Sequence, residues 1–259
     1  MYSDRYVAFV DILGFSEIVR KTKHDETTVR VVALAHALTA IGSHHPSLNE
    51  NDDFQFQTFS DSIVMSSAAT LTGLLHIFHS ISELNISLLK PGLLTRGAVA
   101  RGKLHHDRFV MFGPALLDAY GIETTVAKYP RVVLSRAVYQ DFRRVASGHI
   151  IPRVRLADDG PPYLDIFARF SDLNAAEPTI DFLNSPEVAL AQACQRAIQD
   201  LVDDSIYEPR HYEKLRWLAI YWNTTVARPL GALEPIVLPI SREAEGAGAR
   251  SLTPAEHSA

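Results

Sequence analysis

The stretch RYVAFVDILGF, residues 5–15, decides how the first part of this chain folds. Its apolar side chains predict a buried strand over residues 5–12, and Gly14 permits a tight exit from that strand. Asp11 is the exception, because a carboxylate in a buried strand is costly unless another group pairs with it. Its presence raises the question of what compensates the charge.

The residues that follow predict alternating helices and strands. Helices are expected over 16–43 (with an interruption), 69–89 and 114–128, and strands over a 54–65 hairpin, a 93–113 strand pair, 131–135 and 162–167. The resulting order, β-α-α-β-β-α-β-β-α-β, is that of a ferredoxin-like β-α-β-β-α-β core with additions. We therefore predict an α+β fold.

The rest of the chain predicts a helical extension. Residues 172–185 are expected to be a loop, and residues 186–226 to be helical with a break at Pro209. We predict a core domain over residues 1–170, a helical C-terminal extension over 171–240 and a disordered tail over 241–259, where apolar residues are scarce.

Composition and charge exclude several classes of function. The chain has 259 residues, of which 47% are hydrophobic, and a net charge of −5, so no basic surface favours nucleic acid as a partner. No apolar stretch reaches the roughly 18–20 residues needed to cross a membrane, and the N-terminus lacks a signal-peptide pattern. We predict a cytoplasmic protein that binds neither membrane nor nucleic acid.

A second acidic motif, TFSDSIV at residues 58–64, places Asp61 at the tip of the predicted hairpin. In a ferredoxin-like sheet this hairpin neighbours the first strand, so Asp11 and Asp61 are expected to converge. Taken singly, Asp61 also fits a turn residue and Asp11 a helix cap. Together they favour Mg²⁺ or Mn²⁺, because two adjacent carboxylates repel one another without a cation between them.

These motifs resemble those of class III nucleotidyl cyclases, in the same order and over roughly residues 5–140. FVDILGF resembles their first metal-binding motif, and TFSDSIV resembles their Gly-Asp hairpin with Ser60 in place of glycine. The chain more closely resembles the pyrimidine cyclases of the bacterial Pycsar anti-phage system. Four stretches together carry this similarity: RGAVARGKL, FGPALLDAYGIE, AKYPRVVLS and KLRWLAIYWN. Those enzymes convert UTP or CTP to the 3′,5′-cyclic monophosphate.

The resemblance implies roles for the acidic motifs and the turn between them. Asp11 and Asp61 match the two metal-binding acids, and Ile12 would offer its main-chain carbonyl to the metal. The turn that holds the triphosphate corresponds to Gly14, Phe15 and Ser16. The resemblance further implies two Mn²⁺ or Mg²⁺ ions per site and a homodimer with composite active sites.

The resemblance implies a role in base recognition for Gln57, which lies four residues before Asp61, where purine cyclases carry the lysine or glutamate that reads the base. Its amide both donates and accepts, so it could pair with uracil or cytosine; an ordinary exposed strand residue is the alternative. Tyr120 could narrow the base pocket, although a buried core tyrosine also fits.

The chain departs from the family pattern in its fourth predicted helix, 114–128, and in the strand pair just before it. Leu117 stands in place of the family's asparagine, Gly121 in place of its transition-state arginine, and Val110 in place of its second base-reading acid. These losses argue against a standard adenylyl or guanylyl cyclase. The cations that could replace the arginine are Arg96, Arg101, Lys103, Lys128 and Arg131, of which Arg131 is preferred as the catalytic residue.

The resemblance therefore implies a uridylate cyclase that makes cyclic UMP and pyrophosphate from UTP, as a messenger for a separate anti-phage effector. A cytidylate cyclase making cyclic CMP is the alternative within the same class. A degenerate nucleotide sensor without catalysis is the alternative from another class, because the asparagine and arginine are missing.

Overall fold

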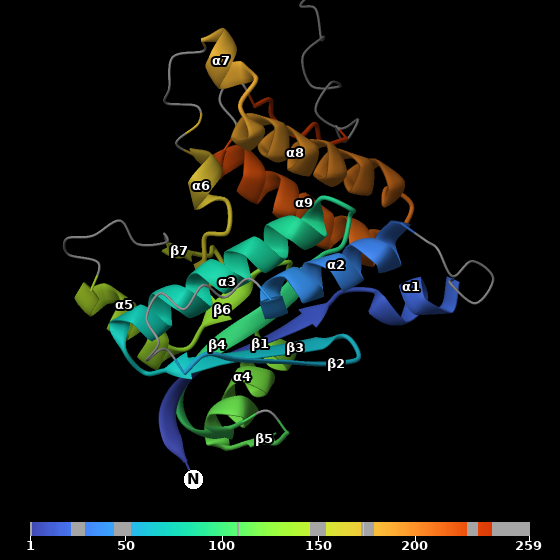
Figure 1. Ribbon diagram of the computed structural model, residues 1–259. Coiled ribbons are helices and arrows are strands. Elements are labelled where there is room, and N and C mark those ends of the chain that lie inside the picture. Colours follow the sequence, from blue (N-terminus) through green and yellow to red (C-terminus); the bar gives the residue numbers. More distant parts are fainter. Residues whose placement is uncertain are drawn as a thin grey trace, which may run out of the picture.

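The computed structural model describes residues 2–21, 29–43, 53–107, 109–145, 154–171, 173, 179–226 and 233–239. Most of the predicted interruption in the first helical stretch and the whole 241–259 tail lie outside these residues. The strands form one mixed sheet in the order β2-β3-β1-β4-β6-β8-β7, and β5 pairs with β4 (Figure 1).

Four antiparallel strands form one half of the sheet, with β2 at its edge. They are β1 (Ser3–Ile12), β2 (Gln55–Phe59), β3 (Ser62–Ala68) and β4 (Thr95–His106), and β1 lies between β3 and β4. The order β2-β3-β1-β4 is the ferredoxin-like arrangement, so the predicted α+β fold is confirmed.

Helices cover both faces of this sheet (Figure 1). α1 (Phe15–Lys21) follows β1 directly, and α2 (Val29–Ser43) and α3 (Leu71–Leu89) cover one face. α4 (Pro114–Thr125) covers the other face, where Ala115 and Ala119 pack against a small apolar cluster of the sheet. The two faces of β1 therefore have different surroundings.

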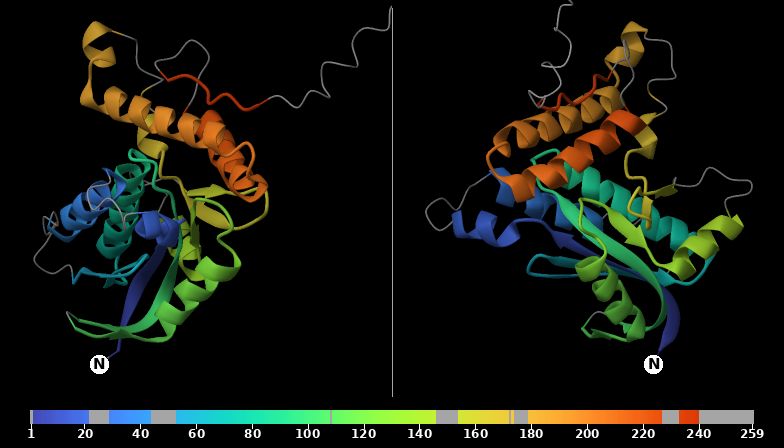
Figure 2. Two further views of the ribbon diagram at one scale, coloured as in Figure 1. Left: turned by 90° about the vertical axis from the view of Figure 1, so that its right-hand side faces the viewer. Right: turned by 180° about the vertical axis from the view of Figure 1, so that it is seen from behind.

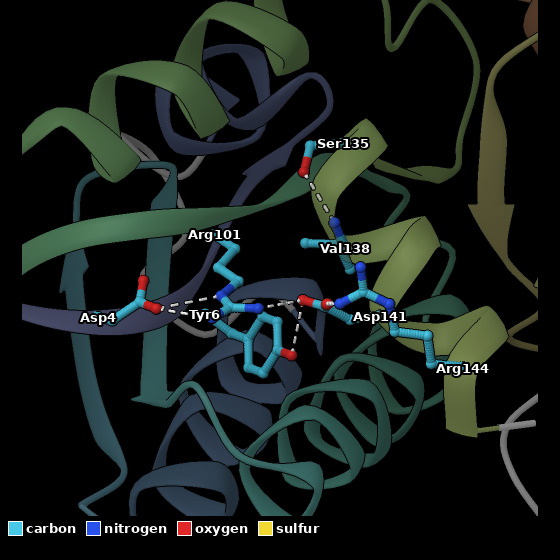
Figure 3. A network of polar contacts seen from close by, with 7 residues as sticks. All are labelled: Asp4, Tyr6, Arg101, Ser135, Val138, Asp141 and Arg144. Atoms are coloured by element: carbon cyan, nitrogen blue, oxygen red, sulfur yellow. Dashed lines mark hydrogen bonds and ion pairs between the residues drawn. The ribbon is translucent and has the colours of Figure 1, made fainter.

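The additions to the core lie beyond β4. They are β5 (Met111–Phe112), β6 (Val132–Leu134), which is parallel to β4, α5 (Arg136–Val145), β7 (Val154–Leu156) and β8 (Pro162–Leu164). The sequence did not predict α5, whose inner side buries Val138 and Asp141. Asp141 is buried because it accepts hydrogen bonds from Tyr6 and Arg101 on the sheet (Figure 3).

The expected loop over 172–185 is partly wrong. α6 (Ala168–Ser171) ends before it, but residues Ile180–Leu183 form the short helix α7. The hydroxyl of Thr179 accepts a hydrogen bond from the Phe182 amide at 3.2 Å, which caps this turn of helix.

The C-terminal extension consists of α8 (Pro186–Asp204) and α9 (Pro209–Thr225), as its apolar spacing predicts. Figure 2 shows both helices stacked beyond α3, on the side away from the sheet. Ile198, Leu218 and Trp222 belong to the same continuous core as Phe78 and Ile81 of α3. In the part of the chain that is described, no helix has the length and apolar content needed to cross a membrane.

Candidate functional site

Asp11 and Asp61 come together where β1 ends. Asp11 lies opposite Ser62 of β3, directly after Asp61, and the Ile12 amide donates a hydrogen bond to the Asp61 carbonyl at 3.0 Å. Burial raises the pKa of the Asp11 carboxyl, and the negative charge of Asp61 raises it further. The two acids are thus close enough to act on one another.

The turns beside the two acids explain two small residues of the sequence. Gly14, with φ at 75°, lies in the turn after β1 and leads into α1 at Phe15. Ser60 has φ at 56° in the two-residue turn between β2 and β3. Positive φ favours glycine, which accounts for the glycine that the resembled family has at this position.

Arg96 of β4 is the nearest compensation for the Asp11 charge. Its Nε lies 3.5 Å from Asp11 Oδ2 and 2.6 Å from Oε1 of Glu123, which comes from α4. The Glu123 side chain is only 3% exposed, and burial and the Asp11 charge both raise its pKa. Neither Arg96 Nε nor Glu123 Oε1 makes a hydrogen bond with a described residue. Asp11 and Glu123 therefore share one guanidinium, and the charge of Asp61 acts on both of them, so this cluster remains rich in negative charge.

Glu123 was not found from the sequence, although its spacing is a usable signal. Ala115, Ala119 and Glu123 recur every four residues and are the buried positions of α4. The two alanines allow the helix to lie close to the sheet, and the third position places a carboxylate on the same inner face. A carboxylate that continues an apolar stripe in this way indicates a cation opposite it.

Gln57 lies on the face of the sheet that carries Asp11. It pairs with Val64, which pairs with Phe9, and Phe9 precedes Asp11 by two residues. The ring of Tyr120 packs edge-on against Phe9 at 5.3 Å. Gln57 is half-buried, and its Oε1 atom has no hydrogen-bond partner among the described residues.

The outer side of α4 is open. Leu117 is 70% exposed and Tyr120 is 51% exposed. The alternative prediction that Tyr120 is a buried core residue is therefore wrong. A Cβ atom added at Gly121 would meet no described atom within 4 Å. Leu117 and Gly121, which the sequence resemblance aligned with an asparagine and an arginine, therefore face outward.

Arg131 lies in an enclosed aromatic cluster. Its side chain is fully buried and donates two hydrogen bonds of 2.7 Å to Asp159. Its guanidinium stacks against Tyr129, Trp217 and Tyr163. None of its contacts within the described residues is with Asp11 or Asp61, so its proposed catalytic role remains a prediction without a contact to support it.

Lys214 of α9 is a cation near the site that the sequence did not indicate. It is half-buried, and its positive charge opposes the burial that raises the pKa of Asp11, although less than the charge of Arg96 does. More than 200 residues separate it from Asp11 along the chain, so only the packing of the C-terminal helices brings the two together.

The donor set at this site fits a metal–nucleotide complex. Across the described part of the chain, no three His, Cys, Asp or Glu side chains form a group that could hold a metal ion alone. Magnesium and manganese commonly take one or two carboxylates and complete their shell with water and substrate phosphates. Asp11, Asp61 and the Ile12 carbonyl match that requirement.

Comparisons with known proteins find similarity to solved structures alone. No family model and no curated protein matches the chain. The chain is similar in structure to the catalytic core of a rhodopsin–guanylyl cyclase with converted specificity in complex with ATPαS (TM-score 0.45, 16% identity, 63% of this chain and 95% of that one). It is also similar to a monomeric guanylyl cyclase domain from the aquatic fungus Blastocladiella emersonii, with a TM-score of 0.43 and 14% identity over 63% of this chain and 95% of that one. A bacterial light-regulated adenylyl cyclase is similar with a TM-score of 0.44 and 14% identity over 75% of this chain and 58% of that one.

Proposed function

We propose that this protein is a nucleotidyl cyclase that converts UTP to 3′,5′-cyclic UMP and pyrophosphate. The observation that carries the proposal is the convergence of Asp11 and Asp61 at the end of β1, beside Arg96. A cluster with more carboxylates than cations favours a divalent cation, and a triphosphate completes the shell of such an ion.

The reaction is an attack of the ribose 3′-hydroxyl oxygen on the α-phosphorus. A new P–O bond forms as the hydroxyl proton is released to water, the bond from the α-phosphorus to the bridging oxygen breaks, and pyrophosphate leaves with that electron pair. Two Mn²⁺ or Mg²⁺ ions, held by Asp11, Asp61 and the Ile12 carbonyl, would supply activation of the hydroxyl and neutralisation of phosphate charge.

The chain itself positions the triphosphate. Arg96 directs its Nε toward Asp11 and Glu123, which leaves its two terminal nitrogens as further donors. Those nitrogens are suited to phosphate oxygens, because a guanidinium binds phosphate through two parallel N–H groups. We assign the main-chain amides of Gly14, Phe15 and Ser16, at the turn that ends β1, to the same task.

The pyrimidine base would lie against Gln57. Its unpaired Oε1 can accept from uracil N3–H, and its amide nitrogen can donate to a uracil carbonyl. Phe59, which is 82% exposed, and Tyr120 provide rings on the same side of the sheet. A rotated Gln57 amide would suit cytosine, so a cytidylate cyclase is the alternative, and UTP is preferred on the family resemblance.

A homodimer with composite sites is part of the proposal. Large apolar side chains are exposed along α4 and the β4–β5 hairpin: Leu117, Tyr120, Phe109, Val110 and Phe112. This surface suits a second copy of the chain, which would bring its own α4 to the site. The cyclic nucleotide would then act in the cytoplasm as a messenger for a separate anti-phage effector.

A nucleotide sensor without catalysis is the second candidate. Leu117 and Gly121 favour it, because neither supplies a polar group toward a transition state. Incubation of the purified protein with each of the four nucleoside triphosphates and Mn²⁺, followed by identification of the products, separates the two candidates. We expect cyclic UMP and pyrophosphate from UTP; binding without pyrophosphate release from any of the four would establish the sensor.

A further inference from the structure

The segment 233–239, which follows α9 in the sequence, lies across the helical extension. It belongs to no helix or strand, and Figure 2 shows it, in red, as an extended trace alongside α8 on the side away from the sheet. Within the described residues, no hydrogen bond joins its main chain to another main-chain group. Because peptide N–H and C=O groups need partners when they are taken from water, side chains must supply the hydrogen bonds of this segment.

Two side-chain amides each bind one residue of the segment through both of its main-chain groups. Asn223 of α9 accepts a hydrogen bond from the Ile236 amide at 2.7 Å and donates one to the Ile236 carbonyl at 2.9 Å. Gln199 of α8 binds Val237 in the same way, accepting at 2.8 Å and donating at 3.1 Å. A carboxamide carries both a donor and an acceptor, so it matches the N–H and C=O of a peptide whatever the side chain is.

A third attachment precedes these two along the segment. The Glu234 carbonyl accepts hydrogen bonds from Gln195 of α8 at 2.8 Å and from the Trp222 indole of α9 at 3.4 Å. Gln195 and Gln199 are four residues apart, so they lie on the same side of α8. The two helices therefore present a continuous row of donors and acceptors to a peptide main chain.

Two buried side chains of the segment provide its apolar contacts. Leu233 is 0% exposed and Ile236 is 3% exposed, and both belong to the core that includes α8 and α9. Val237 is 69% exposed, and Glu234 and Pro235 are exposed as well. The segment is thus bound as a peptide ligand is bound, by its main chain and by two apolar side chains three positions apart.

We propose that the α8–α9 surface is a binding site for an extended peptide segment with two apolar residues three positions apart. Residues 233–239 fill the site within one chain, and the same segment of a second copy fills it in exchange. We assign a second copy because it carries the sequence whose fit to this surface the structure shows. Exchange breaks no main-chain ladder, and an identical segment restores every contact. The side chains that bind the segment all belong to the helical extension, so the inference is independent of the proposed cyclase activity.

Fluorescence anisotropy of a labelled synthetic peptide, residues 231–240 of this chain, tests the site in the full-length protein. Ile236→Asp should release the segment, because it places an unpaired charge in the core, and this variant should bind the peptide. The wild type should bind the peptide at least about tenfold more weakly, because its own segment is present at a high effective concentration. A peptide that itself carries Ile236→Asp is the control and should not bind.

The role of the side-chain amides is tested in the released variant. Adding Asn223→Ala to Ile236→Asp should weaken peptide binding about tenfold or more, because two hydrogen bonds are lost. Arg216→Ala, an exposed change on the same helix, is the matched control and should leave the affinity unchanged. If Ile236→Asp does not melt cooperatively, Val237→Pro serves as the released variant, because it removes a bonded N–H without changing a buried side chain. A released variant that melts cooperatively and does not bind the peptide would overturn the proposal.

Mixing of two full-length variants, followed by native mass spectrometry, tests the exchange. Ile236→Asp has an open site, whereas Gln199→Ala combined with Asn223→Ala has an intact segment and an impaired site. We expect these two chains to form a one-to-one complex that excess peptide dissociates. A mixture in which both chains carry Ile236→Asp is the control and should form no complex that the peptide dissociates. If the peptide binds but the first mixture forms no such complex, the segment acts only within its own chain and the exchange is overturned.

Discussion

β1 and β4 carry two polar clusters on opposite faces of the sheet, and the clusters differ in how well they are satisfied. On one face, Arg101 donates to Asp4 at 2.7 Å and to Asp141 at 2.8 Å, and the Tyr6 hydroxyl donates to Asp141 at 3.0 Å (Figure 3). Arg144 adds a longer bond of 3.4 Å to Asp141. Each charge in this cluster has a hydrogen-bonded partner of opposite sign.

On the other face, Asp11 and Glu123 share Arg96 with Asp61 nearby, and the two atoms that approach most closely, Arg96 Nε and Glu123 Oε1, make no hydrogen bond within the described residues. Burial raises the pKa of both Asp11 and Glu123, so their ionised forms are disfavoured. We call the first group (Asp4, Tyr6, Arg101 and Asp141) the complete cluster, because its charges are all hydrogen-bonded, and such a cluster stabilises the fold. We call the second group (Asp11, Asp61, Arg96 and Glu123) the incomplete cluster, and its unpaired atoms indicate a ligand. The variants below test this difference.

The largest effect is expected from Asp61→Ala. If the acidic cluster holds the catalytic ions, losing one of its two metal-binding carboxylates should reduce cyclisation by about 1,000-fold or more. The change lies in a hairpin turn, so the melting temperature should stay close to that of the wild type. Product analysis by chromatography checks the first statement, and turnover within tenfold of the wild type would exclude the metal assignment.

A substitution in the complete cluster should lower the stability of the protein and leave its activity unchanged. Arg101→Met leaves the Asp141 carboxylate without its main partner, and we expect about 2 kcal/mol lower free energy of unfolding, since Arg101 is partly exposed. Urea denaturation measures the loss, and Arg136→Met on the exposed side of α5 is the matched control. Turnover per folded molecule should not change; a selective loss of turnover would contradict the contrast between the faces.

Removing a charge from the incomplete cluster should stabilise the protein without metal. The pKa of Asp11 is higher in the folded than in the unfolded state, so the folded state keeps its proton over a wider range. Stability therefore falls as pH rises from about 4 through the raised pKa, and Asp11→Asn removes this fall. We expect Asp11→Asn to melt roughly 2–4 °C higher at pH 7, with no difference near pH 3. A lower melting temperature at pH 7 would mean that Arg96 fully compensates Asp11.

The smallest effect is expected from Glu123→Gln. The amide keeps the shape of the side chain, loses the attraction to Arg96 and relieves repulsion from the two aspartates, so the free energy of unfolding should change by less than about 1 kcal/mol. Chemical denaturation at pH 7 measures it. A loss above about 3 kcal/mol would show that Glu123 and Arg96 form a structural pair like Arg101 and Asp141.

The sequence predicts the parts of this contrast that depend on strand order. Alternation places Asp11 and Gln57 on one face once the strands pair, and hairpin geometry brings Asp61 beside Asp11. Glu123, Asp141 and Lys214 could not be predicted in the same way, because their positions depend on how α4, α5 and α9 pack on the sheet. The prediction of Arg131 as the catalytic cation was limited in the same way. Its position in the sequence, next to β6, did not reveal the aromatic cluster that encloses its side chain.

Titration with Mn²⁺ in the presence of UTP, followed by electron paramagnetic resonance, tests the account most directly. We predict that the wild type and Arg101→Met bind two Mn²⁺ ions per site, and that Asp11→Asn and Asp61→Ala lose this binding. Equal Mn²⁺ binding by the wild type and Asp61→Ala would contradict the claim that the incomplete cluster is a metal–nucleotide site.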